Sequence, residues 1–110
     1  MPKPSVTTEL YRDDLLKTLR NPKDAAHYLN ACLDDKDPRV FLLAPRDVAD
    51  SRGGIRALSQ DAGLNREALY RMLSKSGNPS LDSLAAVLKA LGLRLAVQSK
   101  DPKGGRRRAA

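Results

Sequence analysis

Apolar side chains recur at intervals of three and four residues along most of the chain, which is typical of helices with one buried face. The periodic stretches are residues 11–20, 23–35, 38–52, 55–62, 65–75 and 81–92. Polar, proline-containing or glycine-containing connections separate them. The pattern therefore predicts an all-α fold of about five to six helices.

Several connections carry the residues that start and stop helices. Asn21-Pro22 and Asp37-Pro38 each place a capping side chain before a proline, which is tolerated at the first helical position. Ser80 is a similar cap for the last helix, and Gly92 ends it. Pro45 lies inside the third stretch, where it removes one backbone hydrogen bond. We therefore expect either a kink or two short helices joined near Ala44-Pro45.

After Gly92 the period changes from helical to alternating. Leu93, Leu95 and Val97 fall on one side of residues 93–98, and the intervening residues fall on the other. Such alternation predicts a short, half-buried strand. A lone strand in a helical chain would pair with its copy in a dimer or join a sheet in another protein. The alternative is an extended tail packed on the helices, but we assign Leu93, Leu95 and Val97 to a dimer contact.

The two ends of the chain lack periodicity. Residues 1–10 contain two prolines and are predicted to form a flexible arm, and residues 99–110 are predicted to be a disordered basic tail. Between them we expect one compact domain. It joins an N-terminal helical segment, residues 11–52, to residues 53–98, which hold a helix pair, the following helix and the strand.

The helix pair in residues 55–74 has the pattern of a helix-turn-helix, a module that places its second helix in the DNA major groove. Small Ser59 allows the helices to cross closely, Gly63 allows a sharp turn, and Asn65 can cap the second helix. The outer face of that helix carries polar side chains suited to reading bases: Arg66, Glu67, Tyr70, Arg71 and Ser74. The alternative is an ordinary helical hairpin of a small α domain.

The charge distribution favours a polyanionic partner for the second half of the chain. Residues 1–50 hold eight basic and nine acidic residues, a net charge of −1. Residues 51–110 hold twelve basic and four acidic residues, a net charge of +8. The bias persists without the tail, because residues 51–98 still hold seven basic and three acidic residues. The alternative is a solubilising surface with a basic end.

The composition gives little support for a metal site, a phosphate-binding site or a catalytic site. One histidine and one cysteine, Cys32, provide no ligand set for a metal, and no phosphate-binding glycine loop or catalytic constellation occurs. We therefore predict no enzyme activity, no cofactor and no metal site. No apolar run is longer than that from Val40 to Ala44, which is too short to cross a membrane, and no signal peptide is evident. These features predict a cytoplasmic protein without membrane contact.

Two stretches resemble a known family. The run RDVADSRGGIRALSQDAGLNREALYRML, followed by GNPSLDSLAAVLKALGLRL, is similar to the antidotes of bacterial addiction modules, the HigA-like antitoxins with a lambda-repressor-type helix-turn-helix. The preceding KDAAHYLNACLDDKDPRVFLLA is similar to the N-terminal segment of the same family, so that the resemblance spans about residues 13 to 97. Pro45 departs from the family pattern, in which this segment is a continuous helix.

The resemblance implies two roles. Members of this family bind a small RelE/ParE-like toxin, and they also bind the operator of their own operon, usually as homodimers, and repress it. Carried over to this sequence, the DNA-binding positions are Asn65, Arg66, Glu67, Tyr70 and Arg71, with Arg56 facing phosphate. Ser74 and Lys75 extend the same surface.

From these positions a mechanism follows as a hypothesis. Two copies would present residues 65–75 to major-groove half-sites about 34 Å apart. Arg66 and Arg71 are the candidates for guanine, whereas Arg56, Lys75 and the basic tail would contact phosphates. For the toxin, we favour the near-neutral N-terminal helices over the strand, because their aspartates could complement a basic surface: Asp13, Asp14, Asp34, Asp35 and Asp37.

Other functional classes stay open at this point. One is a stand-alone repressor without a toxin partner. Another is a protein-interaction domain whose helix-turn-helix no longer binds DNA.

Overall fold

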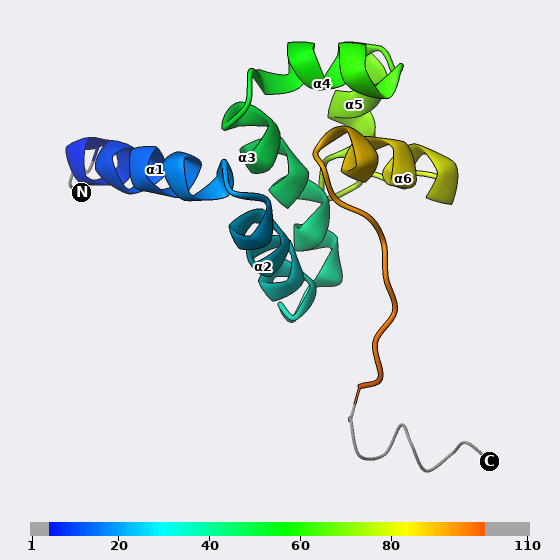
Figure 1. Ribbon diagram of the computed structural model, residues 1–110, viewed down its shortest axis with the longest axis horizontal. Helices are drawn as coiled ribbons and strands as arrows, with labels where there is room; N and C mark the ends of the chain where they lie inside the picture. Colours follow the sequence, from blue (N-terminus) through cyan, green and yellow to red (C-terminus); the bar gives the residue numbers. More distant parts are fainter. Residues whose placement is uncertain (1–4, 101–110) are drawn as a thin grey trace.

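The computed structural model describes the backbone of residues 5–100 and the side chains from residue 11 onward (Figure 1). These residues form α-helices joined by short turns, with one 3₁₀ helix, η1 (Pro38–Leu43). The α-helices are α1 (Ser5–Leu19), α2 (Pro22–Leu33), α3 (Ala44–Asp50), α4 (Gly54–Ala62), α5 (Arg66–Met72) and α6 (Leu81–Ala90). The all-α prediction is therefore confirmed.

The first helix starts earlier than its periodicity predicts. α1 begins at Ser5, so the prediction of a flexible arm over residues 1–10 is wrong for residues 5–10, while residues 1–4 lie outside the described part. No proline or glycine occurs between Ser5 and Asn21. Extending an existing helix costs far less than starting one, so the helix continues through a segment without a clear apolar stripe.

The predicted caps are present. The Asn21 side chain accepts hydrogen bonds from the amides of Lys23 and Asp24, and Pro22 is the first residue of α2. Asp37 accepts from the Arg39 amide at 3.0 Å, and Ser80 accepts from the Ser83 amide at 3.1 Å. Each bond satisfies an amide that the first helical turn leaves without a partner.

Pro45 divides its segment into two short helices, which is one of the two predicted outcomes. The 3₁₀ helix η1 ends at Leu43 and α3 begins at Ala44, so that Pro45 lies in the first turn of α3. An amide at that position would have no intrahelical acceptor, and proline costs little there. The break leaves α3 free to take its own direction.

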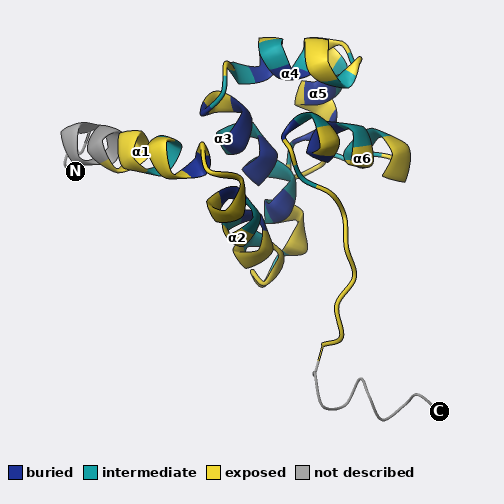
Figure 2. Ribbon diagram, viewed as in Figure 1, coloured by how far each residue is buried: buried dark blue, intermediate teal, exposed yellow. Residues whose placement is uncertain are grey.

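The core is assembled from all of these helices, with α3 at its centre. α3 contacts α1, α2, η1 and α4, and Figure 2 shows buried residues along its length. The buried side chains include Leu19, Leu29, Phe41, Val48, Leu58, Leu69, Leu73, Val87 and Leu88. The amino-terminal part of α1 projects away from this core (Figure 1).

Polar side chains hold the N-terminal helices on α3. Arg12 of α1 donates to Asp47 at 3.0 Å and to Asp50 at 2.6 Å, and the Tyr28 hydroxyl of α2 donates to Asp47 at 2.6 Å. Burial and the Asp47 hydrogen bond both raise the pKa of Tyr28 above its ordinary value. The hydrogen bond to Asp47 also raises the pKa of Arg12 above its ordinary value.

Arg52 joins the ends of two other helices. Its guanidinium donates to the backbone oxygen of Leu19 at 3.1 Å, at the end of α1, and to that of Leu91, just after α6. Carbonyl groups at helix ends lack intrahelical partners and carry partial negative charge, so a cation there is favourable. The position of Arg52 just after α3 therefore connects α1 with α6.

The described residues contain no β-strand, so the predicted strand at 93–98 is not formed in the single chain. The last helix ends at Ala90, and Gly92 terminates it as predicted, with a φ of 80° and a hydrogen bond from the Leu93 amide to the Leu88 oxygen. Beyond it the chain is extended without regular structure (Figure 1). A strand exists only beside a second strand, and residues 5–100 supply none.

Candidate nucleic-acid interface

The turn between α4 and α5 is built on Ser59 and Gly63. The amides of Gly63 and Leu64 both donate to the backbone oxygen of Ser59, at 3.0 and 3.2 Å, and the Ser59 hydroxyl donates to the Leu64 oxygen. Gly63 has a φ of 71°, a conformation that glycine adopts without steric cost. The small side chain of Ser59 and the glycine thus form the sharp turn that the sequence predicts.

α5 is fixed at its start and along its inner face. The Asn65 side chain accepts from the Ala68 amide at 2.7 Å, which confirms its predicted capping role. Leu69 and Met72 are buried against the core. Burying a leucine side chain contributes roughly 1.5–3 kcal/mol, so this face is firmly held.

The opposite face of α5 is open to solvent. Arg66, Glu67, Tyr70 and Arg71 are all exposed, as is Asn65 before them. Arg56 is exposed on α4. One helical face therefore presents two guanidinium groups, a carboxylate and a phenol to the solvent.

The end of α5 differs from the prediction. The helix ends at Met72, so Ser74 and Lys75 lie in the turn that follows and not on the helix. The Ser74 hydroxyl donates to the Arg71 oxygen at 2.9 Å, which supplies the carbonyl with a partner that a longer helix would have provided. Lys75 is exposed in this turn, whereas Ser74 is half-buried.

Gly77 shows why the chain turns so early. A Cβ atom at Gly77 would lie 2.2 Å from the backbone oxygen of Met72 and 2.8 Å from that of Arg71. The chain after α5 folds back onto the last turn of the helix so closely that no side chain fits. Helical periodicity in the sequence does not indicate this close approach.

The cations of this region form no ion pair with an acidic side chain among the described residues, although Lys75, after Arg39, contributes to the lowered pKa of Asp37. The ion pairs of residues 11–100 join Arg12 to Asp47 and Asp50, and Arg39 to Asp37, all in the N-terminal half. Arg56, Arg66, Arg71 and Lys75 take part in none of them. An exposed guanidinium without an internal counterion is available to a phosphate or to the acceptors on a guanine edge.

One residue of this surface was not anticipated. Arg46 of α3 donates from Nη2 to the backbone oxygen of Tyr70 at 3.2 Å, and its Cζ atom lies 5.1 Å from the centre of the Tyr70 ring. No local motif marks Arg46 in the sequence, because α3 and α5 are separated by a whole helix. The contact is visible only when the chain is folded.

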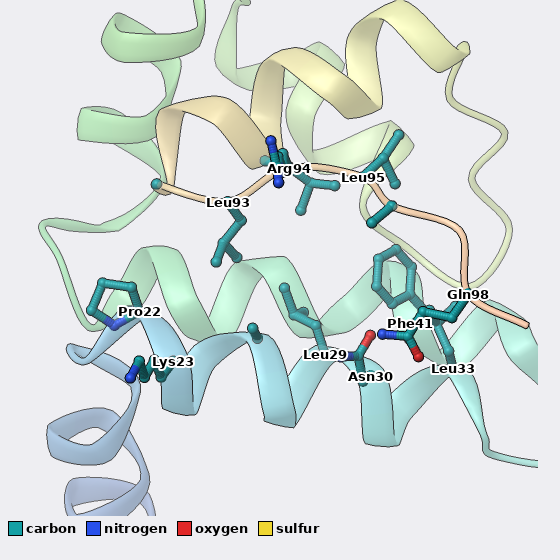
Figure 3. Close-up of a pocket in the computed structure, with 14 residues that line it drawn as sticks. Pro22, Lys23, Leu29, Asn30, Leu33, Phe41, Leu93, Arg94, Leu95 and Gln98 are labelled. Atoms are coloured by element: carbon teal, nitrogen blue, oxygen red, sulfur yellow. The ribbon is translucent and has the colours of Figure 1, made fainter. Parts of the chain in front are cut away.

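The predicted dimer residues lie beside a second feature, a groove of about 720 Å³ between α2 and the C-terminal segment (Figure 3). Leu93 and Leu95 line this groove together with Leu29, Leu33 and Phe41. Val97 is 99% exposed and lies outside it. Leu93 packs against the core, whereas Leu95 and Val97 are exposed farther along the segment.

None of the helices in the described part of the chain is long and apolar enough to span a membrane. No group of three or more histidine, cysteine or acidic side chains in that part could hold a metal ion.

Comparisons with known proteins identify the family. Residues 9–99 match the sequence profile of a family described as "Probable addiction module antidote protein". An uncharacterised protein of Haemophilus influenzae is 34% identical over 93 residues, which cover 84% of this chain and 95% of that protein. No solved structure gives a significant match. The matched residues include every helix from α2 to α6, and the chain therefore belongs to the family of probable addiction module antidote proteins.

Proposed function

We propose that this protein is an antitoxin that represses its own operon by binding DNA through α5. The observation that carries the DNA-binding role is the exposed face of α5, where Arg66 and Arg71 stand without acidic partners beside a firmly packed inner face. A guanidinium can donate to both major-groove acceptors of guanine. Arg56 and Lys75 add phosphate contacts at either end of the helix pair.

A gel-shift series tests the DNA contact. Arg71→Ala is expected to weaken binding to the upstream DNA of the operon by about 1–3 kcal/mol, or roughly ten- to a hundredfold. Lys23→Ala is the matched control, because it removes an equally exposed cation from α2 and is expected to leave affinity nearly unchanged. Unchanged affinity of the Arg71→Ala variant would refute the assignment.

The proposed toxin partner is a small RelE/ParE-like protein with a basic surface. Membership of an antidote family supports a toxin partner in general. The docking region we propose is the N-terminal half, since Asp13 and Asp14 are exposed on the projecting α1 and have no counterion among the described residues (Figure 1). Acidic side chains on a projecting helix complement a cationic toxin.

Co-expression with the neighbouring gene tests this part. The Asp13→Asn, Asp14→Asn double variant is expected to lose co-purification with the toxin and protection of growth. The Asp61→Asn, Asp82→Asn double variant removes two exposed acids from the C-terminal half and is expected to keep both. If the two pairs behave alike, the N-terminal half is not the docking region. A neighbouring gene without a toxic product would favour a stand-alone repressor.

The protein is proposed to act as a homodimer through residues 93–98. The exposed Val97 and half-exposed Leu95 support this, because alternate apolar side chains without cover are suited to strand pairing. Val97→Asp is expected to give a monomer in sedimentation experiments. Ala96→Asp places the same charge on the other side of the segment as a control. A wild-type protein that sediments as a monomer would contradict the dimer.

A further inference from the structure

Arg46 makes both of its observed contacts with a single residue of α5. Its guanidinium lies over the Tyr70 ring, 5.1 Å from the centre, and Nη2 donates to the Tyr70 backbone oxygen at 3.2 Å. Its Nε atom is buried without a hydrogen-bond partner. No acidic side chain among the described residues pairs with it. The position of this guanidinium is therefore set by its contacts with Tyr70 and not by an ion pair.

The two contacts act on different parts of α5. A guanidinium over an aromatic face is attracted to the negative charge of the ring, so it holds the ring in one orientation. The hydrogen bond provides a donor for the backbone carbonyl of Tyr70. This carbonyl lies in the last turn of the helix, where the helix dipole favours a positive charge. The planar guanidinium can stack on the ring and donate to the carbonyl at once, whereas a lysine ammonium is a compact charge without a planar face to stack.

We propose that Arg46 is a positioning residue for DNA readout by α5, acting through Tyr70. Tyr70 is 51% exposed, so one part of its ring lies against Arg46 and the rest is available to a ligand. Holding the ring and the last turn in place also fixes Arg71, the next residue. A preorganised surface binds more tightly to the ligand that it fits, because less motion is lost on binding. This inference rests on the proposed DNA-binding function.

The first experiment needs no DNA. In an NMR spectrum of the full chain, the Nε–H and guanidinium signals of Arg46 are expected to be displaced by the ring current of Tyr70. Tyr70→Leu is expected to remove that displacement, whereas Tyr11→Leu, which changes an exposed tyrosine of α1, is expected to preserve it. Arg46 signals that do not respond to Tyr70→Leu would overturn the proposal.

The second experiment compares the upstream DNA of the operon with a scrambled duplex of equal length. Arg46→Lys preserves the net charge, so binding to the scrambled duplex is expected to stay unchanged. Binding to the upstream DNA is expected to weaken about five- to tenfold, from the lost ring contact and hydrogen bond. Arg52→Lys is the matched control, because Arg52 also contacts helix-end carbonyls but lies away from α5.

A double-variant cycle separates positioning from general stability. If Arg46 acts through Tyr70, Arg46→Lys is expected to have almost no further effect in a Tyr70→Leu background. Additive effects, or an equal loss with Arg52→Lys, would overturn the proposal. Arg46→Gln keeps a donor for the carbonyl and replaces Arg46→Lys if that variant does not fold. A wild-type protein that does not prefer the upstream DNA would instead refute the DNA-binding function on which this proposal rests.

Discussion

The two halves of the described chain use their charged side chains in opposite ways. From Tyr11 to Asp50, Arg12 and Arg39 pair with aspartates of the same half, which joins α1 to α3 and links Arg39 to Asp37 at the start of η1. From Ser51 to Lys100, basic residues outnumber acidic ones, and no ion pair forms among the described residues. Charges that stabilise the fold are already neutralised, whereas unpaired charges remain available to a partner.

Two adjacent residues of α3, Arg46 and Asp47, contact opposite halves of the chain. Arg46 of α3 reaches forward to Tyr70 of α5, and Asp47 accepts hydrogen bonds from Arg12 and Tyr28 of the N-terminal helices. α3 therefore connects the half with paired charges to the half with free ones. This comparison predicts that substitutions of paired charges in the first half change stability, and that substitutions of free charges in the second change binding.

The largest expected effect on stability comes from the close backbone approach at Gly77 in the second half. Because a Cβ atom at Gly77 would lie 2.2 Å from the Met72 oxygen, Gly77→Ala forces the turn after α5 to move. We expect a loss of about 3 kcal/mol in the free energy of unfolding. Denaturant unfolding followed by circular dichroism measures it.

Gly63→Ala is the matched control for that prediction. Gly63 has a φ of 71°, but no atom lies within 4 Å of the position that a Cβ atom would take. Alanine there is therefore expected to add only backbone strain, of about 1–2 kcal/mol. Equal losses for the two variants would show that the close approach at Gly77 does not limit the turn.

The next effect tests the paired charges of the first half. Asp47→Ala leaves Arg12 with one acceptor and the half-buried Tyr28 hydroxyl with none. We expect a loss of about 2 kcal/mol in unfolding free energy, with DNA affinity unchanged. Asp50→Ala removes only the more exposed ion pair and is expected to cost less than about 1 kcal/mol. A fall in DNA affinity of folded Asp47→Ala would break the division between the halves.

A smaller effect is expected for a free charge of the second half. Arg56 is exposed and unpaired on α4, and we propose that it contacts phosphate. Arg56→Gln is expected to weaken operator and scrambled DNA equally, by about 1 kcal/mol, and to reduce the slope of affinity against salt by about one. Salt titrations of both duplexes measure this. A selective loss for the operator would assign Arg56 to base readout instead.

Local signals in the sequence predicted most of the fold. Caps such as Asn21, Asn65 and Ser80 act on amides two or three residues away, so a short window of sequence contains the whole interaction. The same holds for Pro45, whose missing amide confines it to the start of a helix. The outer face of α5 was also predictable, because helical periodicity separates Leu69 from Tyr70 and Arg71.

The remaining features depend on contacts between distant parts of the chain. Nothing near Arg46 in the sequence indicates Tyr70, and Asp47 gives no sign of Arg12. The early end of α5 depends on Gly77 folding back on Met72, which no periodicity reports. The start of α1 at Ser5 was missed for a different reason, since that segment lacks a clear apolar stripe. The assignment of residues to DNA and to the dimer stays a prediction, because both need a partner.

The smallest expected effect is an alkaline loss of stability in the first half. Burial, and then the hydrogen bond to Asp47, raise the pKa of Tyr28, so its protonated form is favoured in the folded protein. This contribution is fully present below the ordinary tyrosine pKa of about 10 and is lost as the pH rises beyond it. Since Tyr28 is only partly buried, we expect a change below about 1 kcal/mol. Unfolding curves on either side of that pH measure it, and Tyr28→Phe is expected to flatten the dependence. An unchanged dependence in Tyr28→Phe would show that another group titrates, and that the Tyr28 hydrogen bond to Asp47 does not stabilise this half measurably.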